Sequence, residues 1–176
     1  MGRREITAGL SALLERRLAK ERAKYAREVE IEETATGKLL RVDYMAYSYT
    51  ATRQGKAAFA ELGIVTVYEV KSCMADYRSG NGLGFCADRN VLVCPSSVAE
   101  QLRGTLPANV EVLCPVPDGR SVYDEMGEQT PYGGETEGWE MQRYFAANDT
   151  VRASSRTPTV YALAQMVYAM CAHGDA

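Results

Sequence analysis

The chain has 176 residues, the size of one ordinary domain, so it can bury a core without disulfides or a structural metal. Five cysteines, an odd number without C-x-x-C spacing, predict reduced thiols and a cytoplasmic location rather than a disulfide framework. The single histidine, His173, is expected to exclude most mechanisms that need an imidazole base or several imidazole ligands. Any metal site should therefore use oxygen ligands, which suit Mg²⁺ or Mn²⁺ better than zinc.

The net charge of −3 is unevenly distributed along the sequence. Residues 118–150 contain two arginines and eight acidic residues, which sum to −6 and leave +3 for the rest of the chain. Residues 1–28 carry eight Lys or Arg against four Glu, an excess that could face a polyanion or could simply be a solvated helix face. No apolar stretch has the length of a signal peptide or a membrane span, so a soluble protein without a membrane partner is expected.

The spacing of apolar residues predicts a series of short elements. Residues 6–27 show three- and four-residue spacing of apolar side chains, which is typical of an amphipathic helix. Ser97 and Glu100 match the capping box of a further helix over 98–104. Alternating or continuous apolar runs predict strands at 27–33, 39–47, 64–71, 90–94 and 110–116.

The order helix, three strands, helical crossover, strand, helix, strand is typical of a mixed α/β fold with a central sheet flanked by helices. We expect one domain over 1–176, with its core at about 6–117 and a closing helix at 159–172. Residues 118–150 are predicted to be a mobile acidic loop or insertion, because they are rich in Gly, Pro and Asn. Residues 48–63 are expected to connect two strands, with one helical turn at most.

Three charged residues interrupt two of the predicted strands. Side chains two apart on a strand share a face, so Glu69 and Lys71 project together at the end of the run 64–71. Asp43 interrupts a second strand, and hairpin-like pairing would bring it beside Glu69. Charges in such positions cost desolvation energy unless partners or a metal compensate them.

Two carboxylates a few ångströms apart repel each other unless a cation lies between them, which predicts a divalent metal site with oxygen ligands. Lys71 could then orient or help deprotonate a metal-bound water for attack on a phosphodiester. The alternative for the same residues is an ion pair at the rim of the sheet, without a catalytic function. The bare pattern of Asp, a gap and Glu-x-Lys is common and does not decide between the two.

The segments RVDYMAY (41–47), YEVKSCMADYRSG (68–80) and DRNVLVCP (88–95) resemble the PD-(D/E)xK, or restriction-endonuclease-like, nuclease superfamily. The resemblance spans about residues 28–117 and is strongest to MmcB-like DNA repair proteins and their relatives in bacteriophages and mobile elements. Its specific part is the run E-V-K-S-x-x-x-D-[FY], which begins at Glu69. The resemblance implies a restriction-endonuclease-like αβββαβ core and a DNA endonuclease that depends on Mg²⁺ or Mn²⁺.

In the site that this resemblance implies, Asp43 and Glu69 hold the metal and Lys71 serves the attacking water. A helix glutamate often completes such a site. Glu15 in the first helix is the candidate, with Glu28 as the alternative, and either residue could instead be a surface charge.

Further residues are candidates to support the site or to contact DNA. Ser72 belongs to the same motif, and Asp76 could be a partner of Lys71 or of the backbone, or the N-cap of a short helix. Basic and polar side chains that could approach a phosphate, with solvated surface as the alternative for each, are Arg16, Arg17, Lys20, Arg78, Asn81 and Arg89.

Other classes of function stay open at this point. The second hypothesis is a catalytically silent nuclease fold that binds nucleic acid or a protein partner as an accessory factor. A third is a nuclease directed at RNA. A homodimer would align basic helix faces along a duplex, the acidic stretch 118–150 could gate the site or bind a protein, and a small-molecule substrate is not expected.

Overall fold

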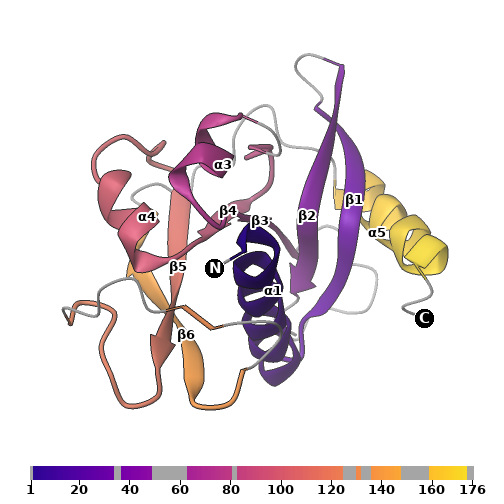
Figure 1. Ribbon diagram of the computed structural model, residues 1–176. Coiled ribbons are helices and arrows are strands. Elements are labelled where there is room, and N and C mark those ends of the chain that lie inside the picture. Colours follow the sequence, from indigo (N-terminus) through magenta and orange to yellow (C-terminus); the bar gives the residue numbers. More distant parts are fainter. Residues whose placement is uncertain are drawn as a thin grey trace.

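The computed structural model describes residues 2–33, 37–48, 63–80, 83–124, 130–131, 136–147 and 159–173. The chain forms a mixed α/β fold in which a six-stranded central sheet is flanked by helices (Figure 1). In chain order the elements are α1 (Arg3–Lys20), β1 (Lys24–Glu33), β2 (Lys38–Ser48), β3 (Ile64–Val70), α3 (Met74–Arg78), β4 (Arg89–Val93), α4 (Ser96–Gln101), β5 (Val110–Pro117), β6 (Trp139–Phe145) and α5 (Thr159–His173).

The strands lie in the sheet in their sequence order, β1-β2-β3-β4-β5-β6. The first three form an antiparallel meander, β3, β4 and β5 run parallel, and β6 returns antiparallel to β5. The parallel pairs are possible because the connections that contain α3 and α4 bring the chain back to the same end of the sheet. The apolar run that forms β3 lies inside the sheet, as its composition predicted.

Helix α1 covers one face of the sheet. Its leucines at three- and four-residue spacing are at most 1% exposed and pack on Tyr68, Val70 and Val91. Burying each of these leucines stabilises the fold by about 2 kcal/mol. Val67 and Leu92 alternate with those strand residues and face the other way, where α5 covers β1–β3 and where α3 and α4 cover β4 and β5.

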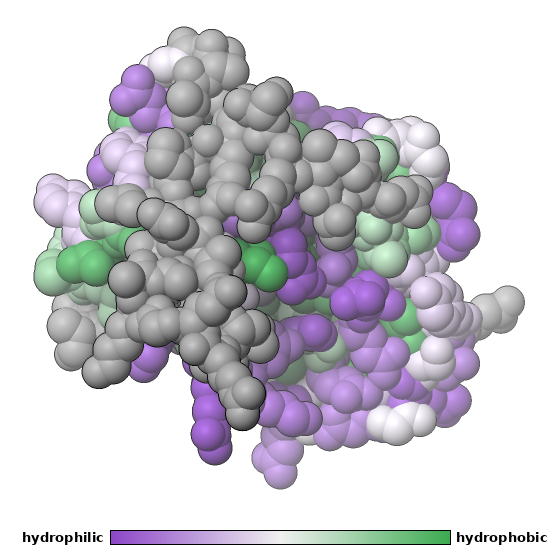
Figure 2. Space-filling view, turned by 180° about the vertical axis from the view of Figure 1, so that it is seen from behind, coloured by the Kyte–Doolittle hydropathy of each residue, from purple (hydrophilic) through white to green (hydrophobic). Residues whose placement is uncertain are grey.

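Helix α5 is apolar on its outer surface as well as on its packed side. Its inner residues include Ala162, Met166 and Ala169, while Val167 and Tyr168 are 60% and 72% exposed. The face behind that of Figure 1 shows hydrophobic residues exposed over α5, whereas the opposite half of that face is mostly hydrophilic (Figure 2). Among the described residues, no helix is long and apolar enough to cross a membrane.

Strands β1 and β2 both interrupt the normal alternation of side chains at the same level. Ala26 and Val29 pack in one cluster although they are three residues apart, and the same holds for Val42 and Met45. The β1–β2 pairing skips one position on each strand at this level, and there Glu28 has a φ of 50° in the left-handed region. The two residues between the packed positions on each strand are thereby turned away from α5.

Two predicted helix boundaries are wrong for local reasons. Helix α1 ends at Lys20, and residues 24–27 belong to β1, because the chain reverses at Arg22 with a φ of 54°. Helix α4 begins at Ser96 with Pro95 as its N-cap, so Ser97 is not the N-cap and the predicted capping box is absent.

The prediction that the core ends near Pro117 is also wrong. Residues 139–145, inside the predicted acidic loop, form β6, which pairs with β5 and buries Met141 and Tyr144. The other described residues of 118–150 are turns and irregular backbone, and the remainder lies outside the described residues, as does most of the connection 48–63. The predicted closing helix is confirmed as α5.

Candidate functional site

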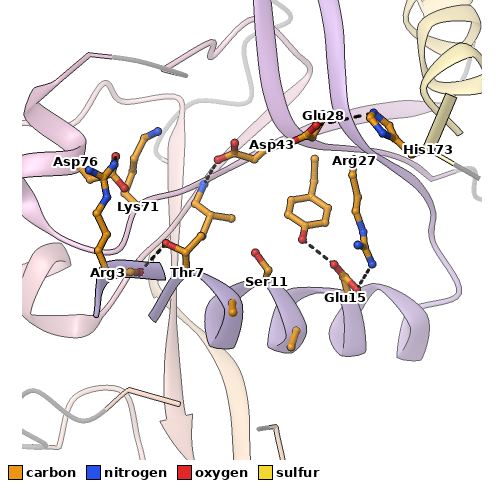
Figure 3. Close-up of a pocket in the computed structure, with 14 residues that line it drawn as sticks. Arg3, Thr7, Ser11, Glu15, Arg27, Glu28, Asp43, Lys71, Asp76 and His173 are labelled. Atoms are coloured by element: carbon orange, nitrogen blue, oxygen red, sulfur yellow. Dashed lines mark hydrogen bonds and ion pairs between the residues drawn. The ribbon is translucent and has the colours of Figure 1, made fainter. Parts of the chain in front are cut away.

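A pocket of about 770 Å³ lies between α1 and the β1–β3 half of the sheet. The break in alternation forms one wall, because Arg27, Glu28, Asp43 and Tyr44, the residues turned away from α5, all line it. Figure 3 shows the charged and titratable side chains that surround the pocket, which are Arg3, Glu15, Arg27, Glu28, Asp43, Lys71, Asp76 and His173.

Asp43 lies where β2 separates from β3. The pairing of these strands ends at Tyr44 and Tyr68, and continuing that register by one residue sets Asp43 opposite Glu69. The Oδ2 atom of Asp43 accepts a 2.7 Å hydrogen bond from the backbone amide of Val70. The carboxylate thus replaces the carbonyl that β2 no longer offers to β3.

Glu69 is fully buried, with 0% exposure. It shares the α5 side of β3 with Val65 and Val67, and its Oε1 accepts a 3.4 Å hydrogen bond from the amide of Gly84. Its Oε2 is buried and has no hydrogen-bond partner among the described residues. Burial first, and then the neighbouring Asp43 carboxylate, raise the pKa of Glu69 to about 9 against the opposing effect of the Lys71 ammonium.

Lys71 follows directly after β3 and is 5% exposed. Its amide donates a 2.9 Å hydrogen bond to the carbonyl of Val93, so its backbone is fixed by β4. The structure thus brings Asp43, Glu69 and Lys71 together around the end of β3. Asp43 and Lys71 line the pocket, whereas Glu69 lies beneath its wall.

Glu15 is held at another part of the pocket. Its Oε1 accepts a 2.7 Å hydrogen bond from the Tyr44 hydroxyl and its Oε2 a 2.6 Å hydrogen bond from Arg27. Burial raises the pKa of Tyr44 well above its usual range, so this hydroxyl stays a donor. Within the described ranges no group of three or more His, Cys, Asp or Glu side chains could hold a metal ion, so Glu15 does not join Asp43 and Glu69.

Glu28, the alternative candidate, binds other partners. Its Oε1 accepts a 2.7 Å hydrogen bond from Arg41, and its Oε2 lies 4.0 Å from Nε2 of His173. The sequence analysis gave His173 no function in the site, yet the end of α5 brings it to the pocket.

Asp76 is 8% exposed and links two segments. It accepts hydrogen bonds from Arg3 and from the backbone amide of Ser72, the latter at 3.4 Å. The N-cap of α3 is Cys73, so the interpretation of Asp76 as N-cap is wrong and its predicted contact with the backbone is confirmed. The hydroxyl of Ser72 is buried without a hydrogen-bond partner among the described residues.

Most of the basic residues that were candidates for phosphate contacts lie outside the pocket. Arg16 donates to the backbone carbonyls of Thr136 and Trp139, and Arg17 donates to that of Met141 at 2.8 Å. These guanidinium groups therefore attach α1 to β6. Lys20 and Arg78 are exposed outside the pocket, Arg89 pairs with Glu111 at 3.1 Å, and Asn81 lies outside the described residues.

No family model matches this chain, and no curated protein matches it. A solved structure, the SPO1766 protein of unknown function from Silicibacter pomeroyi, aligns with 94% of this chain and 84% of its own, at 17% identity and a TM-score of 0.49. A likeness at this level assigns neither an activity nor a site to this chain.

The pocket is lined by both positively and negatively charged side chains. The cations that line it are Arg3, Arg27 and Lys71, and the ion pairs include Arg3 with Asp76 and Arg27 with Glu15. Asp43 and Glu69 are neighbouring carboxyl groups, and the Oε2 atom of Glu69 is buried. Two neighbouring carboxyl groups of this kind can share a proton or hold a cation between them.

Proposed function

We propose that the protein is a divalent-metal-dependent nuclease of the PD-(D/E)xK type that hydrolyses phosphodiester bonds in DNA. The observation that carries the proposal is the position of Asp43, bound to the Val70 amide, next to Glu69 and beside Lys71 at the mouth of a polar pocket. The element order α1, β1–β3, α3, β4 supports the restriction-endonuclease-like αβββαβ core that goes with this site.

The donor set fits Mg²⁺ or Mn²⁺. Mg²⁺ is usually bound by one or two carboxylates together with substrate phosphates, so two carboxyl groups without a third are sufficient. The Oε2 atom of Glu69 is buried, and burial raises the pKa of this carboxyl group to about 9, so the metal-free protein keeps it protonated and a bound cation would replace that proton. Asp43 and Glu69 are the residues that would hold the ion, which when bound would offset negative charge on the phosphoryl group.

Lys71 supplies the remaining chemistry at this end of the pocket. Its ammonium group is buried beside Glu69 and opens on the pocket, where it can hold an attacking water by a hydrogen bond and stabilise the hydroxide character that develops on it. The backbone of Lys71 is fixed by Val93, so the side chain starts from a rigid strand end.

A cleavage assay tests the proposal. The protein is incubated with labelled single-stranded, duplex, nicked and branched DNA, and with RNA, in Mg²⁺, Mn²⁺ or EDTA. We expect metal-dependent cleavage of at least one DNA form, at least about 100-fold slower in Lys71→Ala, and unchanged in the exposed control Lys24→Ala. Survival of every DNA form, or equal rates for Lys71→Ala and the parent, would refute the nuclease proposal; cleavage of RNA alone would replace its substrate.

The complete burial of Glu69 favours one alternative, a catalytically silent nuclease fold that acts as an accessory binding factor. Glu69 is absent from the pocket wall, and Arg16 and Arg17 are bound to β6 rather than free for DNA. Calorimetry with Mn²⁺ separates the two candidates. Binding that is lost in Asp43→Asn favours the nuclease, whereas no binding in the parent favours the silent fold.

A further inference from the structure

The only histidine in the sequence reaches the pocket from the far end of the described chain. Helix α5 is anchored by Ala162, Met166 and Ala169, which are 0–5% exposed and pack on β1–β3. This anchoring fixes the last turn of the helix at the rim of the pocket, where the imidazole of His173 is 41% exposed. The imidazole is therefore accessible to a molecule in the pocket.

Glu28 of β1 lies beside this imidazole. Its carboxylate lies 4.0 Å from Nε2 of His173 and is itself fixed by the 2.7 Å hydrogen bond from Arg41. Glu28 also has a φ of 50°, a left-handed conformation that is unfavourable for a residue with a side chain. Backbone strain of this kind persists where the surrounding structure enforces it, and here it is part of the break that turns Glu28 toward the pocket.

The sheet sets the lateral order of the groups in the pocket. Lys71 follows β3, Asp43 lies in the adjacent β2, and Glu28 lies in β1 beyond it. Neighbouring strands are about 4.8 Å apart, so β3 and β1 are about 10 Å apart. Figure 3 shows the same order, with Asp43 between Lys71 on one side and Glu28 and His173 on the other.

Displacement at phosphorus is an in-line reaction, in which the attacking and leaving oxygens lie on opposite sides of the phosphorus atom. The proposed function assigns the attacking water to Lys71. The leaving oxygen then lies on the other side of Asp43, which is the side of His173. We propose that His173 is the general acid that protonates the leaving oxygen and that Glu28 positions its ring; this proposal rests on the proposed function.

The step balances as a hydrolysis. The water oxygen forms the new bond to phosphorus, and the bond from phosphorus to the leaving oxygen breaks with its electron pair on that oxygen. The imidazolium of His173 gives its proton to this oxygen, which leaves as an alcohol. The proton lost by the water passes to solvent, and the neutral imidazole takes up a proton from solvent before the next turnover.

The charged groups that share the pocket with His173 come from other elements, since α5 contributes no other charged side chain among the residues described. They are Arg3, Glu15, Arg27, Glu28, Asp43, Lys71 and Asp76, and Arg41 of β2 binds Glu28. Of these, Glu28 approaches the imidazole. Glu30, exposed and two residues along the same strand, is a matched control because it does not line the pocket.

Leaving-group dependence tests the proposal. Cleavage of a DNA oligonucleotide, whose alkoxide leaving group needs a proton, is compared with cleavage of thymidine 5′-(4-nitrophenyl phosphate), whose nitrophenolate leaves without one. We expect His173→Gln to lower kcat on DNA by about 100-fold and on the nitrophenyl ester by less than about threefold. Glu28→Gln should lower kcat on DNA by less than His173→Gln does, again with little change on the nitrophenyl ester. Glu30→Gln should have the kcat of the parent on both substrates.

Equal losses on both substrates, or a His173→Gln variant as fast on DNA as the parent, would overturn the assignment of His173 while leaving the nuclease proposal intact. A parent that cleaves neither substrate would overturn the nuclease proposal and this one with it.

A measurement other than activity checks the position of the His173 ring. The imidazole gives one set of proton NMR signals, because the sequence has one histidine. Mn²⁺ should broaden them in the parent but not in Asp43→Asn, and equal broadening in both variants contradicts the placement.

Discussion

The Asp43 carboxylate accepts a 2.7 Å hydrogen bond from the Val70 amide at the point where β2 leaves β3. This bond serves the fold, because the amide would otherwise lack the acceptor that a neighbouring strand provides. It also serves the site, because it holds one carboxylate beside the buried Glu69. The two contributions can be separated by substitution.

Asp43→Asn keeps an oxygen acceptor for the Val70 amide, whereas Asp43→Ala leaves that amide without one. We expect Asp43→Ala to lower the free energy of unfolding by about 1–3 kcal/mol and Asp43→Asn to lower it by much less. Both variants should lose Mn²⁺ binding, since an amide is a weaker ligand than a carboxylate. Urea unfolding and calorimetry measure the two effects; equal stability of the two variants would show that the hydrogen bond does not support the fold.

Glu69 should make the metal-free protein less stable as the pH rises. Its pKa is about 9 in the folded protein, against an ordinary value of 4.5 in the unfolded chain. Between these values the folded state binds more protons than the unfolded state, so this contribution is full below pH 4.5 and is lost as the pH rises toward 9. Each pH unit in this range removes on the order of 1 kcal/mol. Urea unfolding of Glu69→Gln should lack this dependence, and parallel pH profiles of variant and parent would contradict the assignment.

Bound Mn²⁺ should reverse the loss of stability that Glu69 causes as the pH rises. Binding at Asp43 and Glu69 requires the deprotonated carboxyl group, so affinity rises with pH and the ion releases a proton. The increase in melting temperature caused by 1 equivalent or more of Mn²⁺ should therefore be larger at high pH than at low pH. Asp43→Asn is the control, and a stabilisation that does not change with pH would indicate that Mn²⁺ binds elsewhere.

Arg17 should contribute to stability rather than to DNA binding. Its guanidinium donates 2.8 Å to the Met141 carbonyl and so attaches α1 to β6. We expect Arg17→Ala to cost about 1–2 kcal/mol, because the removed hydrogen bond has a charged donor. The exposed Lys20 on the same helix is the matched control, and Lys20→Ala should change stability by less than about 0.5 kcal/mol. A normal melting temperature together with weakened DNA binding in Arg17→Ala would instead support the prediction from the sequence that Arg17 contacts DNA phosphates.

The sequence predicted the parts of the fold and site that depend on local pattern. The apolar run 64–71 marked an inner strand, and the apolar spacing of α1 marked the helix that covers the sheet. The sequence also predicted that Glu69 and Lys71 share a face of one strand, but β3 ends at Val70, and Lys71 lines the pocket whereas Glu69 does not. It did not predict β6, because a short strand in an acidic segment depends on pairing with β5. It did not predict His173 in the pocket either, since the packing of α5 on β1–β3 joins residues far apart in the chain.

The central claim is that Asp43 and Glu69 share a divalent cation beside Lys71, and a crystal soaked in Mn²⁺ tests it most directly. We predict an anomalous density peak between the two carboxylates, about 2.1 Å from an oxygen of each, with Glu69 turned toward the pocket. An ammonium group of Lys71 filling that space as an ion pair, with no peak after soaking, would contradict the claim.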